Sequence, residues 1–293
     1  MDGTKDNQQL VRFALPKGRM QDGVGSLLRD AGIRLSTSSR GYRPSISLPG
    51  FETKLLKPQN IVEMLGAGSR DVGFAGADWV AELDADLVEL LDTGLDPVRI
   101  VAAAPASLLS DGALPKRPLV VASELERLTK RWVEDRGLDA TFVRSYGATE
   151  VFPPEDADCI VDITQTGSTL EANRLEIVDE LMTSSTRLWA SPRAMEDDRK
   201  RDAIERLVVL LRSVLEARSR RVMLEVNVSP ELLDRVIEVL PCMREPTIAP
   251  LHAGGGFAVK AAVPRDRLAT LVPELKASGG TDVVVSSLTQ IVP

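Results

Sequence analysis

The chain has 293 residues, of which 43% are apolar and 27% are charged, and its formal net charge at pH 7 is −7. This length is enough for two or three packed domains, and the negative charge argues against a general nucleic-acid or anionic-membrane surface. Residues 1–9 are polar, no apolar run approaches a membrane span, and the only cysteines are Cys159 and Cys242. We therefore expect a cytoplasmic protein without a disulfide framework.

Short apolar segments alternate with helical patterns in the N-terminal part of the chain. This alternation predicts parallel α/β layers. The predicted elements are a strand over 10–15, a helix over 20–31, a helical segment over 61–65, a strand over 72–74 and a further strand over 99–104. A proline-containing loop follows, and a second α/β series begins at Leu119. We place a domain crossover near residues 99–118.

The second series ends in the most informative segment of the chain, residues 158–170. Before it, the patterns predict a strand over 120–122, an amphipathic helix over 125–136 and a strand over 141–143. The apolar run from Cys159 to Ile163 suits a buried parallel strand, and residues 170–175 are typical of the helix that follows it. We assign residues 100–186 to this lobe.

A loop rich in hydroxyl groups and glycine joins that strand to that helix. At a helix N-terminus, unpaired N–H groups and the positive end of the helix dipole favour an anion, and Gly167 lets the backbone approach it closely. Asp162, at the carboxyl end of the strand, suits sugar hydroxyls. The segment therefore predicts a phosphate cradle. The structural alternative is a capped turn in which Ser168 and Glu171 form a capping box.

The C-terminal part of the chain has a different pattern. A charged helix is predicted over 195–220, with apolar residues at helical spacing. The elements that follow are a strand over 222–228, a helix over 230–240, strands over 247–251 and 257–263, a helix over 267–277 and a strand over 283–288. This βαββαβ order predicts a separate ferredoxin-like domain, which could bind a ligand or build an oligomer interface.

The chain has a single histidine, His252, beside the glycines at 254–256. Ser-His-Asp catalysis, Cys-His catalysis and multi-histidine metal sites all need histidine elsewhere in the chain. We therefore expect chemistry that does not depend on imidazole.

Several motifs, in order along the chain, carry a resemblance to a known family. They are Leu-Pro-Lys-Gly-Arg-Met at 15–20, Asp-Val-Gly-Phe-Ala-Gly-Ala-Asp at 71–78, Gly-Ala-Thr-Glu-Val at 147–151, the loop with Leu-Glu-Ala-Asn at 170–173, and Glu-Pro-Thr-Ile-Ala-Pro-Leu at 245–251. With them the chain resembles long-form ATP phosphoribosyltransferase, the first enzyme of histidine biosynthesis, over essentially its whole length.

The resemblance implies an α/β fold with a two-lobed catalytic body similar to a type II periplasmic binding protein. It also implies a C-terminal ferredoxin-like, ACT-like βαββαβ domain that binds histidine as a feedback inhibitor. Lobe I would comprise residues 1–99 with 187–219, lobe II residues 100–186, and the regulatory domain residues 220–293. Homo-oligomers, dimers and hexamers, are expected as well.

The resemblance also assigns site residues. Phosphoribosyl pyrophosphate would be bound by Asp162, Thr164, Gln165, Thr166, Gly167, Ser168, Thr169 and Leu170. ATP would be bound by Lys17, Gly18, Arg19, Gly76 and Asp78, and the catalytic residues would be Lys17, Arg19, Glu150 and Asp162. Histidine would be bound by Asn227, Met243, Glu245, Thr247, Ala262 and Asp282.

The implied reaction joins the 5-phosphoribosyl group to N1 of ATP and releases pyrophosphate, with Mg²⁺ held mainly by substrate phosphates. Adenine N1 already has a lone pair, so no strong general base is required. The work of the protein is to align two polyanions and to stabilise the departing pyrophosphate with Mg²⁺, Lys17 and Arg19.

Plainer interpretations of these residues remain open. Lys17 and Arg19 can be solvated cations before a helix. Gly73 and Gly76 can merely let a strand turn into a helix. Asp71 and Asp78 can be helix caps.

The chain departs from the family pattern at several positions. Glu124 and Glu126 stand where many members have a basic residue, an aromatic residue and a proline, so two acids lie where phosphates would approach. Lys57-Pro58-Gln59-Asn60 replaces a more usual Arg-Pro-any-Asp run, and Ser168 takes a position often held by arginine. Two alternatives to an active enzyme follow: a small-molecule sensor or binding protein on the same fold, and a catalytically weakened paralogue.

Overall fold

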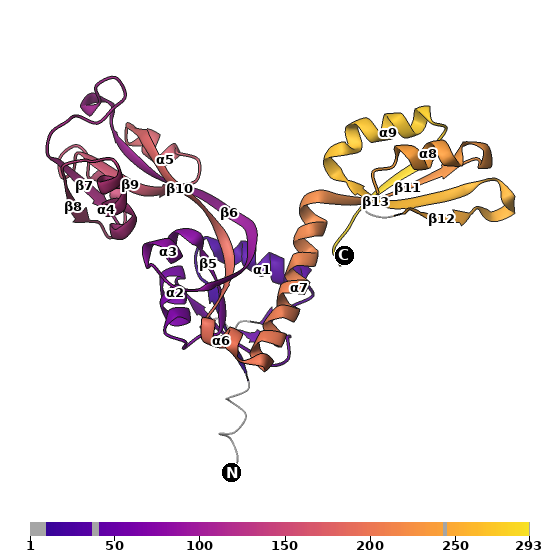
Figure 1. Ribbon diagram of the computed structural model, residues 1–293, viewed down its shortest axis with the longest axis horizontal. Helices are drawn as coiled ribbons and strands as arrows, with labels where there is room; N and C mark the ends of the chain where they lie inside the picture. Colours follow the sequence, from indigo (N-terminus) through magenta and orange to yellow (C-terminus); the bar gives the residue numbers. More distant parts are fainter. Residues whose placement is uncertain (1–9, 37–40, 243–244, 293) are drawn as a thin grey trace, which may run out of the picture. The chain divides into compact units, whose positions relative to one another are not determined.

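The computed structural model describes residues 10–36, 41–242 and 245–292 (Figure 1). The chain forms two compact units, which are described separately below. The first comprises Met1–Ser26 and Arg34–Glu205, and the second comprises Leu27–Ile33 and Arg206–Pro293.

The first unit is built on an eight-stranded sheet with the order β4-β1-β5-β10-β6-β9-β7-β8. Its strands are β1 (Val11–Pro16), β4 (Phe51–Leu56), β5 (Val72–Gly76), β6 (Val88–Pro105), β7 (Leu119–Ser123), β8 (Ala140–Arg144), β9 (Cys159–Thr164) and β10 (Leu175–Ala190). A separate hairpin pairs β2 (Leu35–Ser36) with β3 (Ser45–Ile46).

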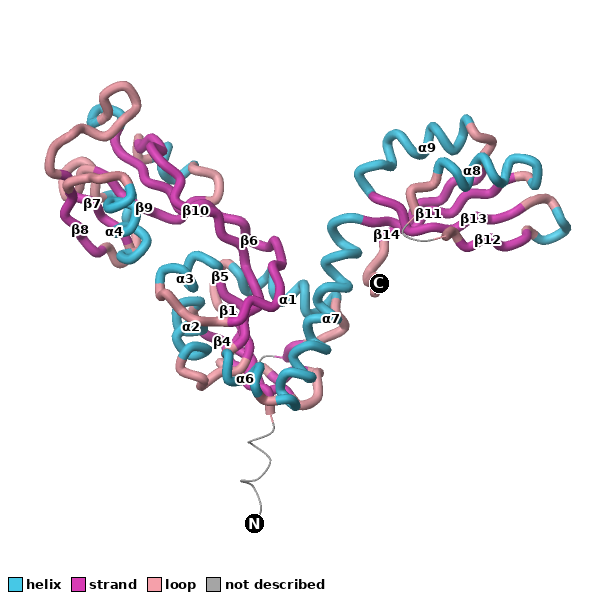
Figure 2. Tube along the Cα trace, viewed as in Figure 1, coloured by secondary structure: helices cyan, strands magenta, loops and turns pink. Residues whose placement is uncertain are grey.

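The large sheet contains two groups of parallel strands. Strands β4, β1 and β5 form the first strand group, and β9, β7 and β8 form the second. The long antiparallel strands β6 and β10 lie between them and run side by side from one group to the other (Figure 2). Because β5 and β6 are both antiparallel to β10 while β9 is antiparallel to β6, the two groups run in opposite directions.

Helices follow the parallel strands, as expected for α/β layers. They are α1 (Met20–Asp30), α2 (Pro58–Gly66), α3 (Ala77–Glu82), α4 (Glu126–Asp135) and α5 (Ser168–Ala172), with 3₁₀ turns η1 (Ala106–Leu108) and η2 (Thr149–Val151). Two more helices, α6 (Pro192–Glu196) and α7 (Asp198–Arg220), follow the antiparallel strand β10, and α7 continues into the second unit. All five residues of β5 are buried, in keeping with a parallel strand covered on both faces. Each strand group has its own cluster of buried apolar residues.

Three sequence predictions for this unit need correction. The strand expected over 99–104 is part of the much longer β6, and its partner β10 was not predicted at all. The helix expected over 170–175 is instead α5, which ends at Ala172. Arg174 has φ 58°, in the left-handed region, so the helix cannot continue into Leu175, which begins β10.

The helix expected over 195–220 is divided in two. Asp197 has φ −84° and ψ 109°, which is extended backbone, and it separates α6 from α7. Its Oδ1 accepts hydrogen bonds from the N–H groups of Arg199, at 3.1 Å, and Lys200, at 3.2 Å. Asp197 therefore caps α7, because those N–H groups lie in the first turn and have no partner within the helix.

The second unit contains the predicted βαββαβ domain. Its elements are β11 (Arg221–Val228), η3 (Pro230–Leu232), α8 (Leu233–Val239), β12 (Thr247–Pro250), η4 (His252–Gly254), β13 (Phe257–Pro264), η5 (Arg265–Arg267), α9 (Leu268–Ala277) and β14 (Thr281–Ser287). The sheet order is β12-β13-β11-β14, with antiparallel pairs throughout. This arrangement confirms the ferredoxin-like prediction.

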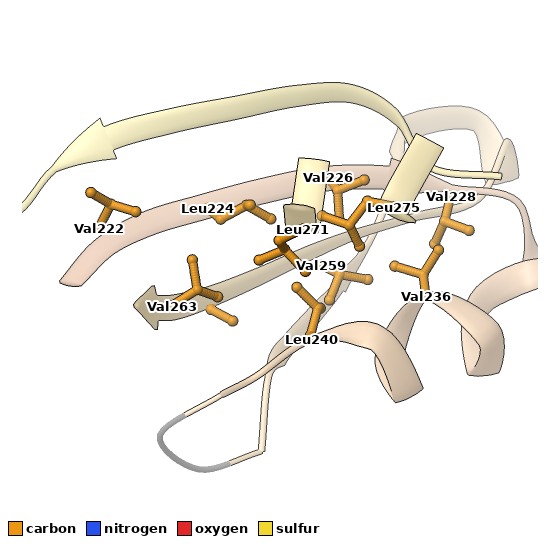
Figure 3. Packing of buried hydrophobic residues seen from close by; sticks show 11 residues of the cluster. Val222, Leu224, Val226, Val228, Val236, Leu240, Val259, Val263, Leu271 and Leu275 are labelled. Atoms are coloured by element: carbon orange, nitrogen blue, oxygen red, sulfur yellow. The ribbon is translucent and has the colours of Figure 1, made fainter. Parts of the chain in front are cut away.

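Strand periodicity explains which face of this sheet is covered. In β11, buried residues alternate with half-buried ones, so Val222, Leu224, Val226 and Val228 share one face. That face packs with Leu271 and Leu275 of α9 and with Val236 of α8 in one apolar cluster (Figure 3). The opposite face carries the intervening residues, among them Asn227.

Candidate active site

The carboxyl ends of the two strand groups point toward each other. Gly76, the last residue of β5, pairs with Thr186 of β10, and Thr186 pairs with Leu95 of β6. Thr164, the last residue of β9, pairs with Arg99 of β6. Strand β9 is antiparallel to β6, so it runs in the direction opposite to β5. The two sets of carboxyl ends therefore face each other along β6 between residues 95 and 99. Open α/β sheets bind ligands at the carboxyl ends of their strands.

The predicted phosphate loop begins at one of these ends. The Thr164 hydroxyl accepts the N–H of Gly167 at 2.9 Å, and Gly167 has φ 86°, a conformation that favours glycine. The hydroxyls of Thr166 and Ser168 lie 3.0 Å apart. Gln165, Thr166, Ser168 and Thr169 are exposed, whereas Leu170 is buried and anchors the turn.

The capping-box alternative for this loop is wrong. Gly167 is the residue that caps α5, and Ser168 is the first residue of the helix. A capping box needs the hydroxyl residue before the first helical residue, so Ser168 and Glu171 are one position too far along the chain. The Ser168 N–H donates to the Thr166 hydroxyl at 3.3 Å instead.

Asp162 of β9 has an unusual electrostatic environment. Its pKa is raised to about 6: burial is the main cause, the negative charges of Glu150 and Glu124 act in the same direction, and the Ile163 N–H, 2.7 Å from Oδ1, opposes them. The two acids come from different elements: Glu150 lies in η2, and Glu124 directly follows β7. The three carboxyl groups are thus close enough to interact, and Asp162 ionises near neutral pH.

A turn with two cations stands at the carboxyl end of β1. The Lys17 N–H donates to the Leu56 carbonyl at 2.9 Å, which ties the turn to β4. Gly18 has φ 80° and its carbonyl accepts the Gln21 N–H at 3.0 Å. The Lys17 ammonium lies 3.7 Å from the centre of the Tyr42 ring, and the Arg19 side chain is exposed. Tyr42 was not predicted as a site residue from the sequence.

Gly76 and Asp78 are held in a tight contact at the end of β5. A Cβ added to Gly76 would lie 2.0 Å from Asp78 Oδ1, so any other residue there would force the Asp78 side chain to move. Asp78 is 1% exposed, its Oδ1 accepts the Ser184 hydroxyl at 2.7 Å, and its N–H donates to that hydroxyl at 3.0 Å. Asp78 is the second residue of α3 and Gly76 precedes the helix, so Asp78 is not its N-cap.

Comparison with known proteins decides the family. The ATP phosphoribosyltransferase family model matches residues 57–213, and the model of the HisG C-terminal domain matches residues 218–290. The chain belongs to the ATP phosphoribosyltransferase family. Members of this family are pentosyltransferases of the first step of histidine biosynthesis, and the long-form architecture is confirmed.

Individual relatives agree with this assignment. The ATP phosphoribosyltransferase of Pelotomaculum thermopropionicum is 35% identical over 288 residues, covering 97% of this chain and 99% of the relative. That of Chlorobium phaeobacteroides is 34% identical over 290 residues, covering 97% and 98%. A solved structure, the ATP phosphoribosyl transferase (HisG:HisZ) complex from Thermotoga maritima, matches with a TM-score of 0.63 and 26% identity, covering 71% of this chain and 99% of that chain.

The two acids that depart from the usual ATP phosphoribosyltransferase pattern have different surroundings. Glu126 forms an ion pair with Arg144 and another with Lys130 at 2.7 Å, and these partners lower its pKa. Its charge is therefore compensated locally. Glu124 instead acts on Asp162, whose pKa it raises. Of the two departures, only Glu124 adds negative charge to the predicted phosphate site.

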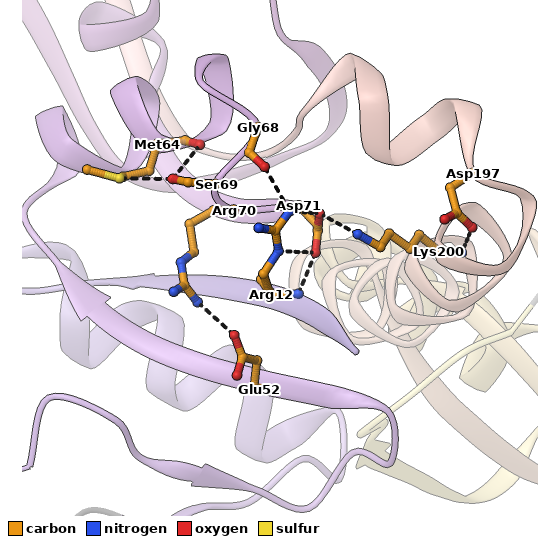
Figure 4. A network of polar contacts seen from close by, with 9 residues as sticks. All are labelled: Arg12, Glu52, Met64, Gly68, Ser69, Arg70, Asp71, Asp197 and Lys200. Atoms are coloured by element: carbon orange, nitrogen blue, oxygen red, sulfur yellow. Dashed lines mark hydrogen bonds and ion pairs between the residues drawn. The ribbon is translucent and has the colours of Figure 1, made fainter. Parts of the chain in front are cut away.

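Asp71, at the amino end of β5, belongs to a structural network and is not a helix cap. Arg12 donates to its carboxylate through the backbone N–H at 2.7 Å, Nε at 3.0 Å and Nη2 at 2.8 Å, and Lys200 Nζ lies 3.0 Å away (Figure 4). Burial alone would raise the pKa of Asp71, but these cations together lower it. Neither partner was predicted from the sequence, because both are far from Asp71 along the chain.

Three of the predicted histidine-binding residues, Asn227, Thr247 and Ala262, lie on the exposed face of the C-terminal sheet. Asn227 lies between the core residues Val226 and Val228, and its Nδ2 donates to Asp282 Oδ2 at 3.1 Å. Ala262 lies between two core residues of β13, and Thr247 pairs with Lys260 on the same face. Glu245 is exposed beside β12, and Met243 lies outside the described residues.

Two surveys of the described residues complete the description. Among them, no group of three or more His, Cys, Asp or Glu side chains is arranged to hold a metal ion. Over the same residues, no helix combines the length and apolar character that crossing a bilayer requires.

Proposed function

We propose that this chain transfers the 5-phosphoribosyl group of phosphoribosyl pyrophosphate to N1 of ATP at the facing carboxyl ends of its two strand groups. The observation that carries the proposal is the strand register, which brings the Lys17 turn and the end of β5 opposite the Asp162 strand and its loop. The reaction has two polyanionic substrates, and one can be bound from each side. Alignment of two bound reactants contributes much of the catalysis in such a reaction.

Asp162 and the loop from Thr164 to Leu170 bind phosphoribosyl pyrophosphate in this proposal. A carboxylate accepts the hydrogens of sugar hydroxyls, and Asp162 is ionised above about pH 6. The exposed Thr166, Ser168 and Thr169 supply hydroxyl donors for the 5-phosphate. Gly167 lets the backbone come close to the phosphate because it has no Cβ.

ATP and the departing pyrophosphate are bound from the first strand group. Lys17 and Arg19 supply positive charge for the pyrophosphate as it leaves, and Gly18 allows the turn that presents them. Gly76, with Asp78 behind it, forms a surface on which a side chain is excluded. Such a surface suits the close approach of a nucleotide.

Glu150 and Asp162 are the acids closest to the proposed reacting sugar. Mg²⁺ usually binds through one or two carboxylates together with substrate phosphates, so two neighbouring carboxyl groups fit a metal that enters with its substrate. When bound, Mg²⁺ would neutralise pyrophosphate charge as the bond to the sugar breaks. The negative charge that remains on Asp162 and Glu150 favours an oxocarbenium-like sugar, which is electron-deficient.

The direct test is the ultraviolet absorbance of purified protein with ATP, phosphoribosyl pyrophosphate, Mg²⁺ and pyrophosphatase. We expect a steady rise for the wild-type chain and a rate reduced by ~100-fold or more for Asp162→Ala, with an unchanged circular dichroism spectrum. No rise from folded wild-type protein would favour the sensor or weakened-paralogue alternative, for which Glu124 beside Asp162 is the specific support. Unchanged turnover in Asp162→Ala would remove Asp162 from the site.

Histidine is the proposed inhibitor, bound on the exposed face of the C-terminal sheet. The carboxylates of Asp282 and Glu245 suit its amino or imidazolium group, and Asn227 and Thr247 supply amide and hydroxyl groups. We expect Thr247→Ala to weaken inhibition by histidine about tenfold while leaving uninhibited turnover unchanged. Equal inhibition of this variant and the wild type would remove Thr247 from the histidine site.

The proposed organisation has lobe I at residues 1–99 with 187–219, lobe II at 100–186 and the histidine-binding domain at 220–293. We also propose that the protein is a cytoplasmic homo-oligomer, forming dimers and hexamers. Sedimentation velocity with and without histidine tests the oligomeric part of this proposal.

A further inference from the structure

Besides β6 and β10, two helices connect the two strand groups. Helix α3 follows the first strand group and helix α4 follows the first strand of the second, and the two helices contact each other. Trp79 of α3 and Met182 of β10 are partly buried and pack against the apolar clusters of both groups. This contact joins the helix that follows β5 to the helix that follows β7, the strand paired with β9.

A carboxylate forms the polar part of this contact. Glu82, the last residue of α3, is 8% exposed. Its Oε1 accepts the Arg127 N–H at 3.1 Å, and its Oε2 accepts the Leu128 N–H at 3.0 Å. Both N–H groups lie in the first turn of α4, where a helix has no internal acceptors for them.

Glu82 supplies the side-chain hydrogen-bond acceptor that the N-cap residue of α4 lacks. That residue is Leu125, which makes no side-chain hydrogen bond to the helix. An acceptor for these N–H groups usually comes from a Ser, Thr, Asp or Asn immediately before the helix. Here the acceptor comes from residue 82, and its negative charge also faces the positive end of the α4 dipole.

We propose that Glu82 is a positioning residue, which acts by holding the start of α4 against α3 and thereby sets the separation of the two facing sets of carboxyl ends. The helix it belongs to begins directly after Gly76, and the helix it caps begins two residues after Glu124. A change in this contact moves the two sides of the proposed site relative to each other. Misplacement of bound reactants by about 1 Å can lower the rate by ~100-fold.

The test compares Glu82→Ala with Ser123→Ala. The Ser123 hydroxyl accepts the Leu125 N–H at 2.9 Å and donates to the Val161 carbonyl at 2.6 Å, so its loss weakens the start of α4 without touching α3. Asp84→Asn is a second control, because Asp84 pairs with Arg127 at 3.1 Å on the surface, where the Asp84 side chain is 68% exposed and the Arg127 side chain 57%. For each folded variant, kcat, KM for both substrates and tryptophan emission are measured.

We expect Glu82→Ala to lower kcat/KM at least tenfold, mainly through higher KM values, and to shift tryptophan emission to the red as Trp79 loses its packing. Ser123→Ala removes two buried hydrogen bonds and should lower the unfolding temperature, whereas Asp84→Asn should lower it at most slightly. Neither variant should change the kinetic constants or the tryptophan emission. Wild-type kinetics and emission in folded Glu82→Ala would overturn the proposal. The same changes in Ser123→Ala would also overturn it, since they would arise from weakening α4 alone.

Glu82→Gln decides the question if Glu82→Ala does not fold. Its amide oxygen can accept one of the two N–H groups, so we expect a smaller loss of kcat/KM and a smaller red shift. Values equal to those of the wild type in both readouts would overturn the proposal. The kinetic part rests on the proposed function, whereas the emission does not; a wild-type chain without activity would therefore disprove the function and leave the emission to test Glu82.

Discussion

Asp71 and Asp162 belong to the same sheet but to opposite kinds of strand end. Asp71 stands at the amino end of β5 and receives hydrogen bonds from Arg12 and Lys200, which together lower its pKa. Asp162 lies toward the carboxyl end of β9, with two further acids nearby, and its pKa is raised to about 6. One carboxyl group is compensated by cations, while the other is buried beside two like charges.

The difference separates a residue that stabilises the fold from one available for chemistry. A buried ion pair with all its hydrogen bonds made contributes nothing to a ligand, because its acceptors are already used. An acid that is destabilised by burial and by like charges is ready to interact with an incoming hydroxyl or cation. Three mutational and titration experiments test this contrast, and they are ordered by expected effect.

The largest effect is expected for Asp71→Ala. This variant leaves Arg12 and Lys200 without their acid, in a place where the Asp71 side chain is only 3% exposed. Loss of one partner of such a network costs about 3–5 kcal/mol of unfolding free energy, which urea unfolding measures. Glu52→Ala is the control, since it removes only the 3.3 Å pair with Arg70, whose Glu52 side chain is 34% exposed. We expect that control to cost less than about 1 kcal/mol. Equal costs for the two variants would contradict the contrast.

Asp162→Asn should raise the free energy of unfolding, whereas Asp71→Ala should lower it. The folded pKa of about 6 lies above the ordinary aspartate value of 3.8, so the ionised carboxylate is less favourable in the folded state. The cost is fully present above pH 6, declines as pH falls, and is absent below 3.8; it amounts to about 3 kcal/mol. Asparagine has no charge and keeps an oxygen for the Ile163 N–H.

The measurement is urea unfolding of wild-type and Asp162→Asn protein at pH 8 and at pH 4. We expect Asp162→Asn to be the more stable at pH 8 by up to about 3 kcal/mol and nearly equal at pH 4. A variant that is destabilised at both pH values would show that Asp162 serves the fold. Turnover of Asp162→Asn should be lost at both pH values.

The smallest effect is a shift in the pH dependence of turnover. If ionised Asp162 binds the sugar, kcat/KM falls tenfold per pH unit below about pH 6 and is level above it. Glu124→Gln removes one of the negative charges that raise the pKa of Asp162, so the inflection should move to lower pH. An inflection at the same pH in both proteins would mean that another group is responsible.

Local patterns were sufficient to predict much of the fold. The apolar run over 222–228 predicted the strand β11, and the order of elements predicted the βαββαβ domain. Strand β10 was missed because its residues are mostly half-buried or exposed and its ladder with β6 contains several bulges, so no regular alternation marks it. The end of α5 was misplaced because Arg174, a residue without an obvious turn signal, takes the left-handed conformation.

The candidate site divides in the same way. The sequence indicated Asp162, its hydroxyl-rich loop and the Lys17 turn, because each consists of neighbouring residues with a local chemical meaning. It did not indicate Tyr42 or Glu82, and it gave Asp71 the wrong structural role. Each of these depends on a partner elsewhere: Asp71 lies 59 residues from Arg12, and Glu82 lies 45 residues from Arg127.

By itself, the sequence determined the family, the order of elements in the C-terminal domain, and the residue types available for binding two phosphorylated substrates. Only the tertiary structure decided which acids are neutralised, which one remains under repulsion, and which helix start is capped from another helix. The physical reason is the separation along the chain of the residues that interact. Strand periodicity and turn formation act between residues close in the chain, whereas ion pairs and helix caps of this kind require groups that only folding brings within hydrogen-bonding distance.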